Sequence, residues 1–150
     1  MRRKYPKHPL VGVGALIFTR SGRRGPILLV ERAGEPLKGY WSLPGGLVET
    51  GELLEDAVRR EILEETGLRV TPVGRFGIFE RIMRSPQGRV EYHYLLVDYL
   101  CKVAGGKLRA GDDVSRAAWV RRAELDRYQI TEGTRAVIER AFSEEHSDAG

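Results

Sequence analysis

The chain has a single cysteine, Cys101, in 150 residues. It cannot form an intramolecular disulfide, and its place within an apolar run favours a small core residue in a reducing compartment over a catalytic thiol. Long hydrophobic runs are also lacking, since no segment approaches the ~18 apolar residues that a membrane-spanning helix needs. The basic start of the chain carries no apolar stretch of signal-peptide length. These absences predict a soluble, cytoplasmic protein with no membrane partner.

Internal repeats, low-complexity tracts and linker-like segments are absent as well. With 41% hydrophobic and 31% charged residues, the composition fits one domain with one sizeable core. We therefore expect a single domain over residues 1–150, with frayed ends at 1–8 and 143–150. The formal net charge of +4 suits acidic ligands such as nucleotides. Nucleic acid is not favoured as a partner, because no dense Lys/Arg patch is interleaved with aromatic residues.

Apolar runs separated by Gly- and Pro-containing turns predict a mixed α/β order of elements. Strands are expected at 11–18, 27–32, 40–43, 70–79, 90–103 and 117–120. The turn at 84–88 should join two of them into a long antiparallel hairpin. Helices are expected at 53–66 and 131–142, the second capped by Thr131. Its inward side would carry Ala136, Val137, Ile138, Ala141 and Phe142. The sum is a mixed sheet with helices packed on its faces.

Three carboxylates, Glu61, Glu64 and Glu65, fall within roughly 100° of arc on the first of these helices. They continue the apolar stripe instead of facing away from it, and their repulsion and the helix dipole together cost roughly 1 kcal/mol or more. A bound divalent cation would reverse the sign of both terms. A solvated acidic face is the alternative reading, and the phase relative to the stripe favours the cation. Gly67 can end the helix in the left-handed conformation, which places the acids beside a loop.

These residues belong to a longer pattern with fixed spacing. Gly46 is followed by five residues, Glu52, seven residues, and then Arg-Glu-Ile-Leu-Glu-Glu-Thr-Gly-Leu at 60–68. The pattern resembles the Nudix box at every fixed position. The resemblance implies a Nudix-type α/β/α sandwich with a mixed central sheet. It also implies a hydrolase of phosphorus-containing anhydrides, in which water attacks phosphorus and splits a pyrophosphate bridge.

The resemblance further implies roles for the box residues. Glu61, Glu64 and Glu65 would be catalytic metal ligands, and Gly46 would offer its backbone carbonyl to the metal. Hard oxygen ligands suit Mg²⁺, with Mn²⁺ as an alternative. Glu61 or a carboxylate outside the box would accept the proton of the attacking water, and the number of metal ions is open. Glu52 and Arg60 would form an ion pair that fixes the loop to the helix and supports the site.

Three residues outside the box are candidates for substrate binding. Arg32 ends a strand near the box loop and could clamp a phosphate, with a solvated strand end as the rival reading. Trp41 could stack a nucleobase, although aromatic residues in strands also build cores. Asp113, next to Asp112, could supply a further acid near the metal or close an Asx-turn.

The substrate is implied only as a class, a nucleoside diphosphate linked to another group. ADP-ribose or a nucleotide sugar is the first expectation. An oxidised nucleoside triphosphate is the second, a non-catalytic nucleotide-sensing module the third, and an RNA-end processor the fourth. Met83 stands about where many ADP-ribose hydrolases carry a proline, which weakens a narrow assignment. A homodimer is also considered, with the strand at 90–103 pairing across the interface.

Overall fold

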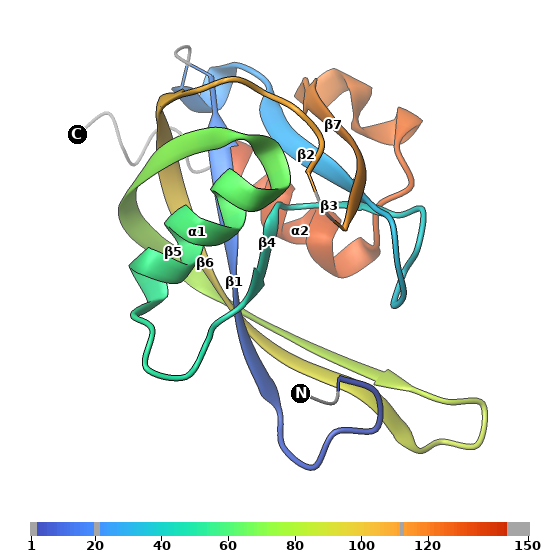
Figure 1. The fold of residues 1–150 in the computed structure, drawn as a ribbon. Helices are drawn as coiled ribbons and strands as arrows, with labels where there is room; N and C mark the ends of the chain where they lie inside the picture. The colour runs from blue at the N-terminus through green and yellow to red at the C-terminus, as the bar shows by residue number, and fades with distance from the viewer. Residues whose placement is uncertain (1–2, 20–21, 112, 144–150) are drawn as a thin grey trace.

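The computed structural model describes residues 3–19, 22–111 and 113–143. Asp112, one of the acids considered above, lies outside the described residues. The strands are β1 (Leu10–Phe18), β2 (Ile27–Arg32), β3 (Trp41–Ser42), β4 (Gly45–Leu47), β5 (Leu68–Arg84), β6 (Val90–Gly106) and β7 (Val114–Val120). The α-helices are α1 (Leu54–Thr66) and α2 (Glu132–Ser143), and the 3-10 helices are η1 (Gly22–Arg24) and η2 (Arg122–Arg127) (Figure 1). Among these helices none is long and apolar enough to cross a membrane.

The strands form one mixed sheet in the order β3-β2-β1-β6-β5, with β4 paired to β1 and β7 paired to β2. β1 runs parallel to β6 along its whole length and antiparallel to its other neighbours. On that second edge, β2 pairs at Phe18 whereas β4 pairs at residues 12–14. β2 and β4 therefore pair with different parts of the same edge of β1. The start of the box, with Gly46, enters the sheet through β4.

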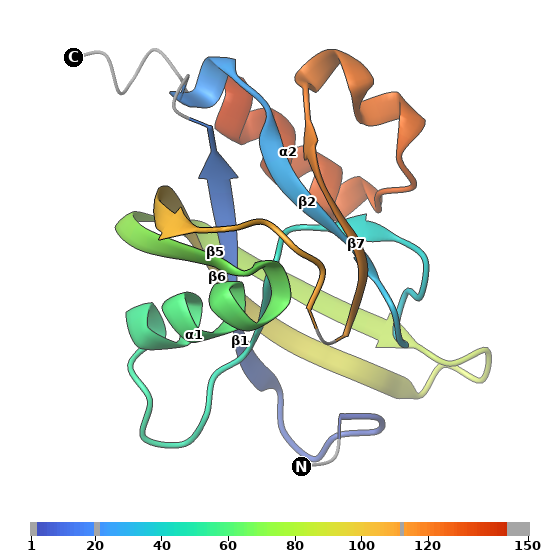
Figure 2. The same cartoon turned by 45° about the horizontal axis from the view of Figure 1, so that its top comes forward.

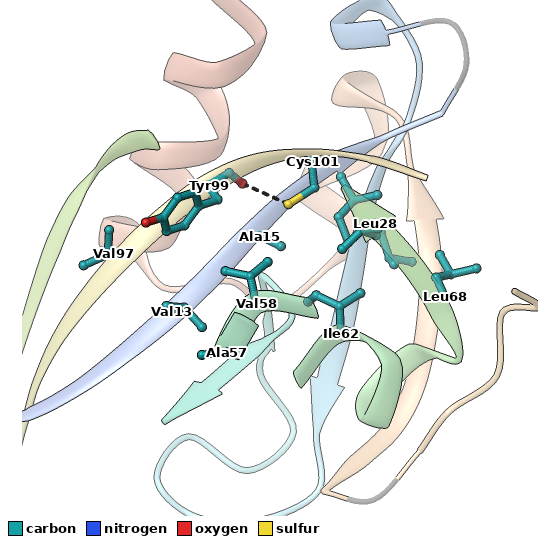
Figure 3. Close-up of a cluster of buried hydrophobic side chains, with 12 residues drawn as sticks. Val13, Ala15, Leu28, Ala57, Val58, Ile62, Leu68, Val97, Tyr99 and Cys101 are labelled. Atoms are coloured by element: carbon teal, nitrogen blue, oxygen red, sulfur yellow. Dashed lines mark hydrogen bonds between the residues drawn. The ribbon is translucent and has the colours of Figure 1, made fainter. Parts of the chain in front are cut away.

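The two α-helices cover opposite faces of the sheet (Figures 1 and 2). Ala57, Val58 and Ile62 of α1 are fully buried in one cluster with alternate residues of β1 and β6 (Figure 3). Ile138, Ala141 and Phe142 of α2 are buried in a second cluster that includes Leu16 of β1. This period-2 alternation of buried residues builds two cores from one sheet. The predicted α/β fold with helices on both faces is confirmed.

Helix α1 ends as its sequence predicts. Gly67 has φ 75° and its backbone N–H donates to the Leu63 carbonyl at 3.0 Å. Leu68 then packs into the α1-side core with 5% exposure. The left-handed cap turns the chain directly into β5, so the last turn of α1 is held against the sheet.

The hairpin of β5 and β6 is longer than expected and projects from the body of the molecule (Figure 1). Its turn closes with the Ser85 N–H donating to the Arg89 carbonyl at 2.8 Å. Near the start of the chain, the backbone N–H of Tyr5 donates to the Glu91 carbonyl at 2.7 Å. The fraying expected for 1–8 and 143–150 and the single domain over 1–150 stay predictions.

The structure differs from the sequence-based expectations in one side-chain position and in several short elements. Ala136 is exposed, and Thr134 takes the buried place on α2 instead, because the helix turns its Thr134–Ile138–Ala141 side to the sheet. Neither of the 3-10 helices, η1 and η2, was expected. The short strand β4 was not expected either, because its two glycines have low strand propensity. Its pairing to β1 is a tertiary contact that no local pattern reports.

Candidate active site

A cavity of about 420 Å³ opens where β4, α1 and β2 meet. At one end it is lined by Gly46 and by the three acids of α1. It continues under the loop at 34–37 to a far end formed by β5, β6 and the start of α2. The cavity therefore connects the box acids to a second, separate set of side chains.

Glu65 is the most deeply placed of the acids. Its Oε1 accepts a hydrogen bond from the Gly45 N–H at 2.8 Å, and no Lys or Arg among the described residues forms an ion pair with it. The pKa of Glu65 is raised to about 8, chiefly by burial and in smaller part by the charges of Glu61 and Asp113, while the Gly45 hydrogen bond and the charge of Arg32 oppose the shift. The side chain is therefore a carboxyl group that lacks a cation.

Glu61 lies directly over the box glycine. A Cβ atom at Gly46 would collide with the Glu61 carboxylate, so a residue without a side chain is needed for this approach. Burial raises the pKa of Glu61, although a hydrogen bond from Arg60 opposes the shift. The helix face that turns inward thus carries Glu61 and Glu65.

Glu64 differs from the other two acids. Its side chain is 56% exposed, and its one ion pair among the described residues is with Arg60 Nη1 at 3.4 Å. It lines the cavity from the solvent side. The expectation that all three acids continue the buried stripe is therefore wrong for Glu64. This residue lies outside the buried face of α1.

Arg60 ties the box loop to the helix. Its Nε and Nη2 donate to the two carboxylate oxygens of Glu52 at 2.7 and 2.9 Å, and Nη2 also donates to the Leu47 carbonyl at 3.0 Å. This fork holds the pKa of Glu52 at about 2. Nη1 donates to Glu61 Oε1 at 2.8 Å. One side chain therefore fixes the loop, the helix and one of the box acids.

Glu52→Gln should weaken this fork, since the amide nitrogen cannot accept the second hydrogen bond. We expect a lower melting temperature and a loss of about 10-fold in kcat/KM, because the loop carrying Gly46 moves relative to α1. Glu55→Gln removes the same charge from the exposed start of α1 and is the matched control. Equal activity and melting temperature in the two variants would contradict the positioning role.

The donor set at the acid end suits a hard divalent cation, because it consists of carboxylate and carbonyl oxygens. Across the described ranges, no three Asp, Glu, His or Cys side chains form a group able to hold a metal ion as they stand. In this conformation Arg60 Nη1 lies between Glu61 and Glu64, and Glu49 is 3.8 Å away. The guanidinium of Arg60 thus lies among the acids on this side of the cavity. This arrangement fits a site that attracts positive charge.

The three substrate-binding candidates all line the cavity. Arg32 donates from Nε to the Pro36 carbonyl at 2.7 Å, which holds its guanidinium near the loop at 34–37. Asp113 is exposed, with φ 64°. Trp41 is 7% exposed and packs edge-on to Tyr128 with ring centroids 5.0 Å apart, so most of the ring belongs to the α2-side core.

The far end of the cavity contains polar residues that the sequence analysis did not select. Arg81 Nη2 donates to Thr134 Oγ1 at 2.9 Å, and no described Asp or Glu forms an ion pair with this guanidinium. Burial lowers the pKa of Arg81, and the charge of Arg32 lowers it further. Asp98 is 4% exposed, and burial raises its pKa to about 6. A single acid inside the apolar run 94–101 was the signal that could have identified Asp98.

In this fold, acids on a helix and arginines line the same cavity. Such a combination suits phosphate groups, because arginines bind phosphate oxygens and carboxylates can hold a divalent cation beside them. The family comparison identifies the class of protein to which this fold and site belong. The model of the NUDIX domain matches residues 8–141, and the chain belongs to the Nudix hydrolase family. The resemblance drawn from the box is confirmed.

Two curated relatives and one solved structure are similar to the chain. The ADP-ribose pyrophosphatase of Methanocaldococcus jannaschii is 41% identical over 110 residues, which cover 73% of this chain but only 60% of that protein's length. The nucleoside triphosphatase NudI of Klebsiella pneumoniae (strain 342) is 32% identical over 105 residues, covering 67% of this chain and 74% of that protein. A MutT NUDIX hydrolase from Burkholderia pseudomallei matches with a TM-score of 0.75 at 31% identity, covering 89% of this chain and 98% of that one.

Proposed function

We propose that the chain hydrolyses the diphosphate bridge of a nucleoside diphosphate linked to another group, with ADP-ribose or a nucleotide sugar as the substrate. The observation that carries this proposal is the single cavity that joins the box acids to a polar far end. A diphosphate placed at the acids would leave room for a bulky group on its other side. The 41% identity to a protein named as an ADP-ribose pyrophosphatase supports the same substrate class.

The box residues would hold Mg²⁺, or Mn²⁺ in its place, through Glu61, Glu64, Glu65 and the Gly46 carbonyl. When bound, the ion neutralises phosphate charge and lowers the pKa of a coordinated water. The Gly45 N–H holds Glu65 in place, and Arg60 holds Glu61. Water adds to one phosphorus, the bridging P–O bond breaks, and the proton of the water passes to a carboxylate. Glu61 and Asp113 are the two candidates for that base, since both line the cavity.

The arginines would bind the phosphates from the opposite side. Arg32 and Arg81 line the cavity, and each carries a positive charge without a carboxylate partner among the described residues. Two like charges in one cavity repel each other, and a diphosphate would remove that repulsion. We therefore assign both to substrate binding.

Arg81→Met should raise KM by about 10- to 100-fold while changing kcat less, because it removes a phosphate contact and leaves the acids in place. Arg75→Met, on an exposed position of the same strand, is the matched control and should keep the wild-type KM. Steady-state kinetics on ADP-ribose measures both. A wild-type KM in the Arg81 variant would remove this residue from the binding site.

A substrate panel tests the function itself. It contains ADP-ribose, nucleotide sugars, dinucleoside polyphosphates and normal or oxidised nucleoside triphosphates, each with Mg²⁺ and with products identified by mass. We expect the highest kcat/KM for ADP-ribose or a nucleotide sugar, with two phosphate monoesters as products. Faster cleavage of triphosphates would instead support the second candidate, which the similarity to a nucleoside triphosphatase favours. Binding without turnover would support the nucleotide-sensing alternative.

A homodimer is a further proposal, although not through the expected strand. β6 pairs with β1 over Tyr94–Lys102 and with β5 on its other side, so it has no free edge there. Exposed apolar residues on one side of the projecting sheet, Val11, Ile78 and Ile82, are the alternative surface. Light scattering of the wild type and of Ile78→Glu would test it. The cytoplasmic location stays a prediction, which the buried free thiol of Cys101 suits.

A further inference from the structure

Asp98 is a carboxyl group at the floor of the far end of the cavity. It lies in the middle of β6, on the same side as Leu96 and Leu100, which is the side covered by α2. It is 4% exposed, and the cavity lining includes it. The small exposed part of this carboxyl therefore faces the cavity.

The lack of a side chain on the neighbouring strand β1 gives this carboxyl its space. A Cβ atom at Gly14 of β1 would collide with Asp98 Oδ1, and Leu43 is the next nearest side chain there. On the opposite side, Asp98 pairs with Gly77 of β5, and the guanidinium of Arg140 lies over this glycine, 3.3 Å from where a Cβ atom would be. Glycines therefore flank Asp98 on both adjacent strands, and any larger residue at position 14 would displace the carboxyl.

No described residue donates a hydrogen bond to the Asp98 carboxyl, and no described Lys or Arg forms an ion pair with it. Arg140 of α2 affects it only through a longer-range charge. A buried carboxyl without donors costs several kcal/mol, so such a group is retained where a partner supplies the donors. The site is open to the cavity, so a ligand that enters the cavity can supply those donors.

The walls around Asp98 suit a flat ring. Leu96 and Phe79 on the sheet and Val137 on α2 are apolar and line the same cavity. Arg81 and Thr134 add polar groups to this end of the cavity. Apolar walls with a carboxylate acceptor at the floor match a nucleobase that carries N–H donors on its edge. We propose that Asp98 accepts a hydrogen bond from the exocyclic amino group of the substrate's nucleobase, and so selects amino-bearing purines over oxo purines. The inference rests on the proposed function, whose substrate it specifies.

The test is a comparison of nucleotide affinities by calorimetry in EDTA, where the metal-dependent reaction does not occur. ADP carries an amino group at the position where IDP carries an oxygen. We expect the wild type to bind ADP at least about 5-fold more tightly than IDP, since an oxygen facing the carboxyl leaves two acceptors unpaired. Asp98→Asn supplies both a donor and an acceptor, so we expect the ratio of the two affinities to shift toward IDP by about 10-fold.

The controls separate this inference from its alternatives. Ribose 5-diphosphate, which has no base, should bind both proteins equally, and Asp56→Asn, an exposed acid on α1, should keep the wild-type ratio. An unchanged ratio in Asp98→Asn, or no binding of ADP and IDP to the wild type, would overturn the inference. Cleavage of ADP-ribose together with an unchanged ratio would leave the proposed function in place, whereas a shifted ratio without cleavage of any diphosphate would retain the inference and reject the function.

Discussion

Glu65→Gln is expected to lower kcat by at least about 1,000-fold, because the substitution removes a carboxylate that we propose as a ligand of the catalytic metal. The same variant should be more stable without metal at pH 7, by about 1 to 3 kcal/mol, because the wild-type carboxyl is buried without a cation. The amide oxygen of the substituted side chain can still accept the hydrogen bond from the Gly45 N–H. The combination of lost activity and gained stability is specific to a buried functional acid.

Glu64→Gln is the matched comparison. It removes the same charge one residue earlier, where the side chain is 56% exposed and paired with Arg60. We expect a large loss of activity here too, but no gain in stability. Thermal melts in EDTA and steady-state rates with Mg²⁺ measure both quantities. Full turnover in Glu65→Gln would contradict its assignment as a ligand, and equal melting temperatures of the two variants would contradict the difference in burial.

Asp98→Asn should gain stability relative to the wild type as the pH rises. The pKa of Asp98 is raised from 3.8 to about 6 in the folded protein, so the folded state holds this proton more tightly than the unfolded state. The protonated Asp98 therefore contributes its full amount to the free energy of unfolding of the wild type below about pH 4. This contribution is lost between about pH 4 and 6, and it stays lost at higher pH. An amide does not titrate, so the difference between the two proteins should grow by about 2 to 3 kcal/mol from about pH 4 to about pH 8.

Urea unfolding at several pH values measures this difference. The groups that face Asp98 are the backbone of Gly14, Gly77 on β5 and the more distant guanidinium of Arg140 on α2. The buried acids of α1 titrate in both proteins, so their effects cancel in the difference. A difference that stays constant over the whole pH range would show that Asp98 is not buried as a free carboxyl.

The sequence predicts the parts of this fold that local patterns control. The α1 helix ends where Gly67 allows the left-handed cap, and the strands at 11–18 and 27–32 lie within one residue of their predicted bounds. The fixed spacing from Gly46 to Leu68 identifies the family, because these residues form one continuous segment that runs from β4 through the box loop into α1 and its cap. Glu61 and Glu65 also lie on the inward side, as the helical phase indicates.

Other parts depend on contacts between distant segments. The far end of the cavity draws Arg81 from β5, Asp98 from β6 and Thr134 from α2, which meet only because β6 lies between β1 and β5. β4 is a strand because β1 accepts it, although its own residues do not favour one. Glu64 is exposed because the buried face of α1 is formed by Ala57, Val58, Ile62 and Thr66, and Glu64 lies outside it. Each of these depends on how the elements pack, which no local pattern specifies.

The central claim is that the box acids cleave a diphosphate bridge. The most direct test incubates the wild type and Glu65→Gln with ADP-ribose and Mg²⁺, and identifies the products by mass. We predict AMP and ribose 5-phosphate from the wild type, formed only with the metal, and neither product at a comparable rate from the variant. Equal cleavage by both proteins, or cleavage that persists in EDTA, would contradict the account.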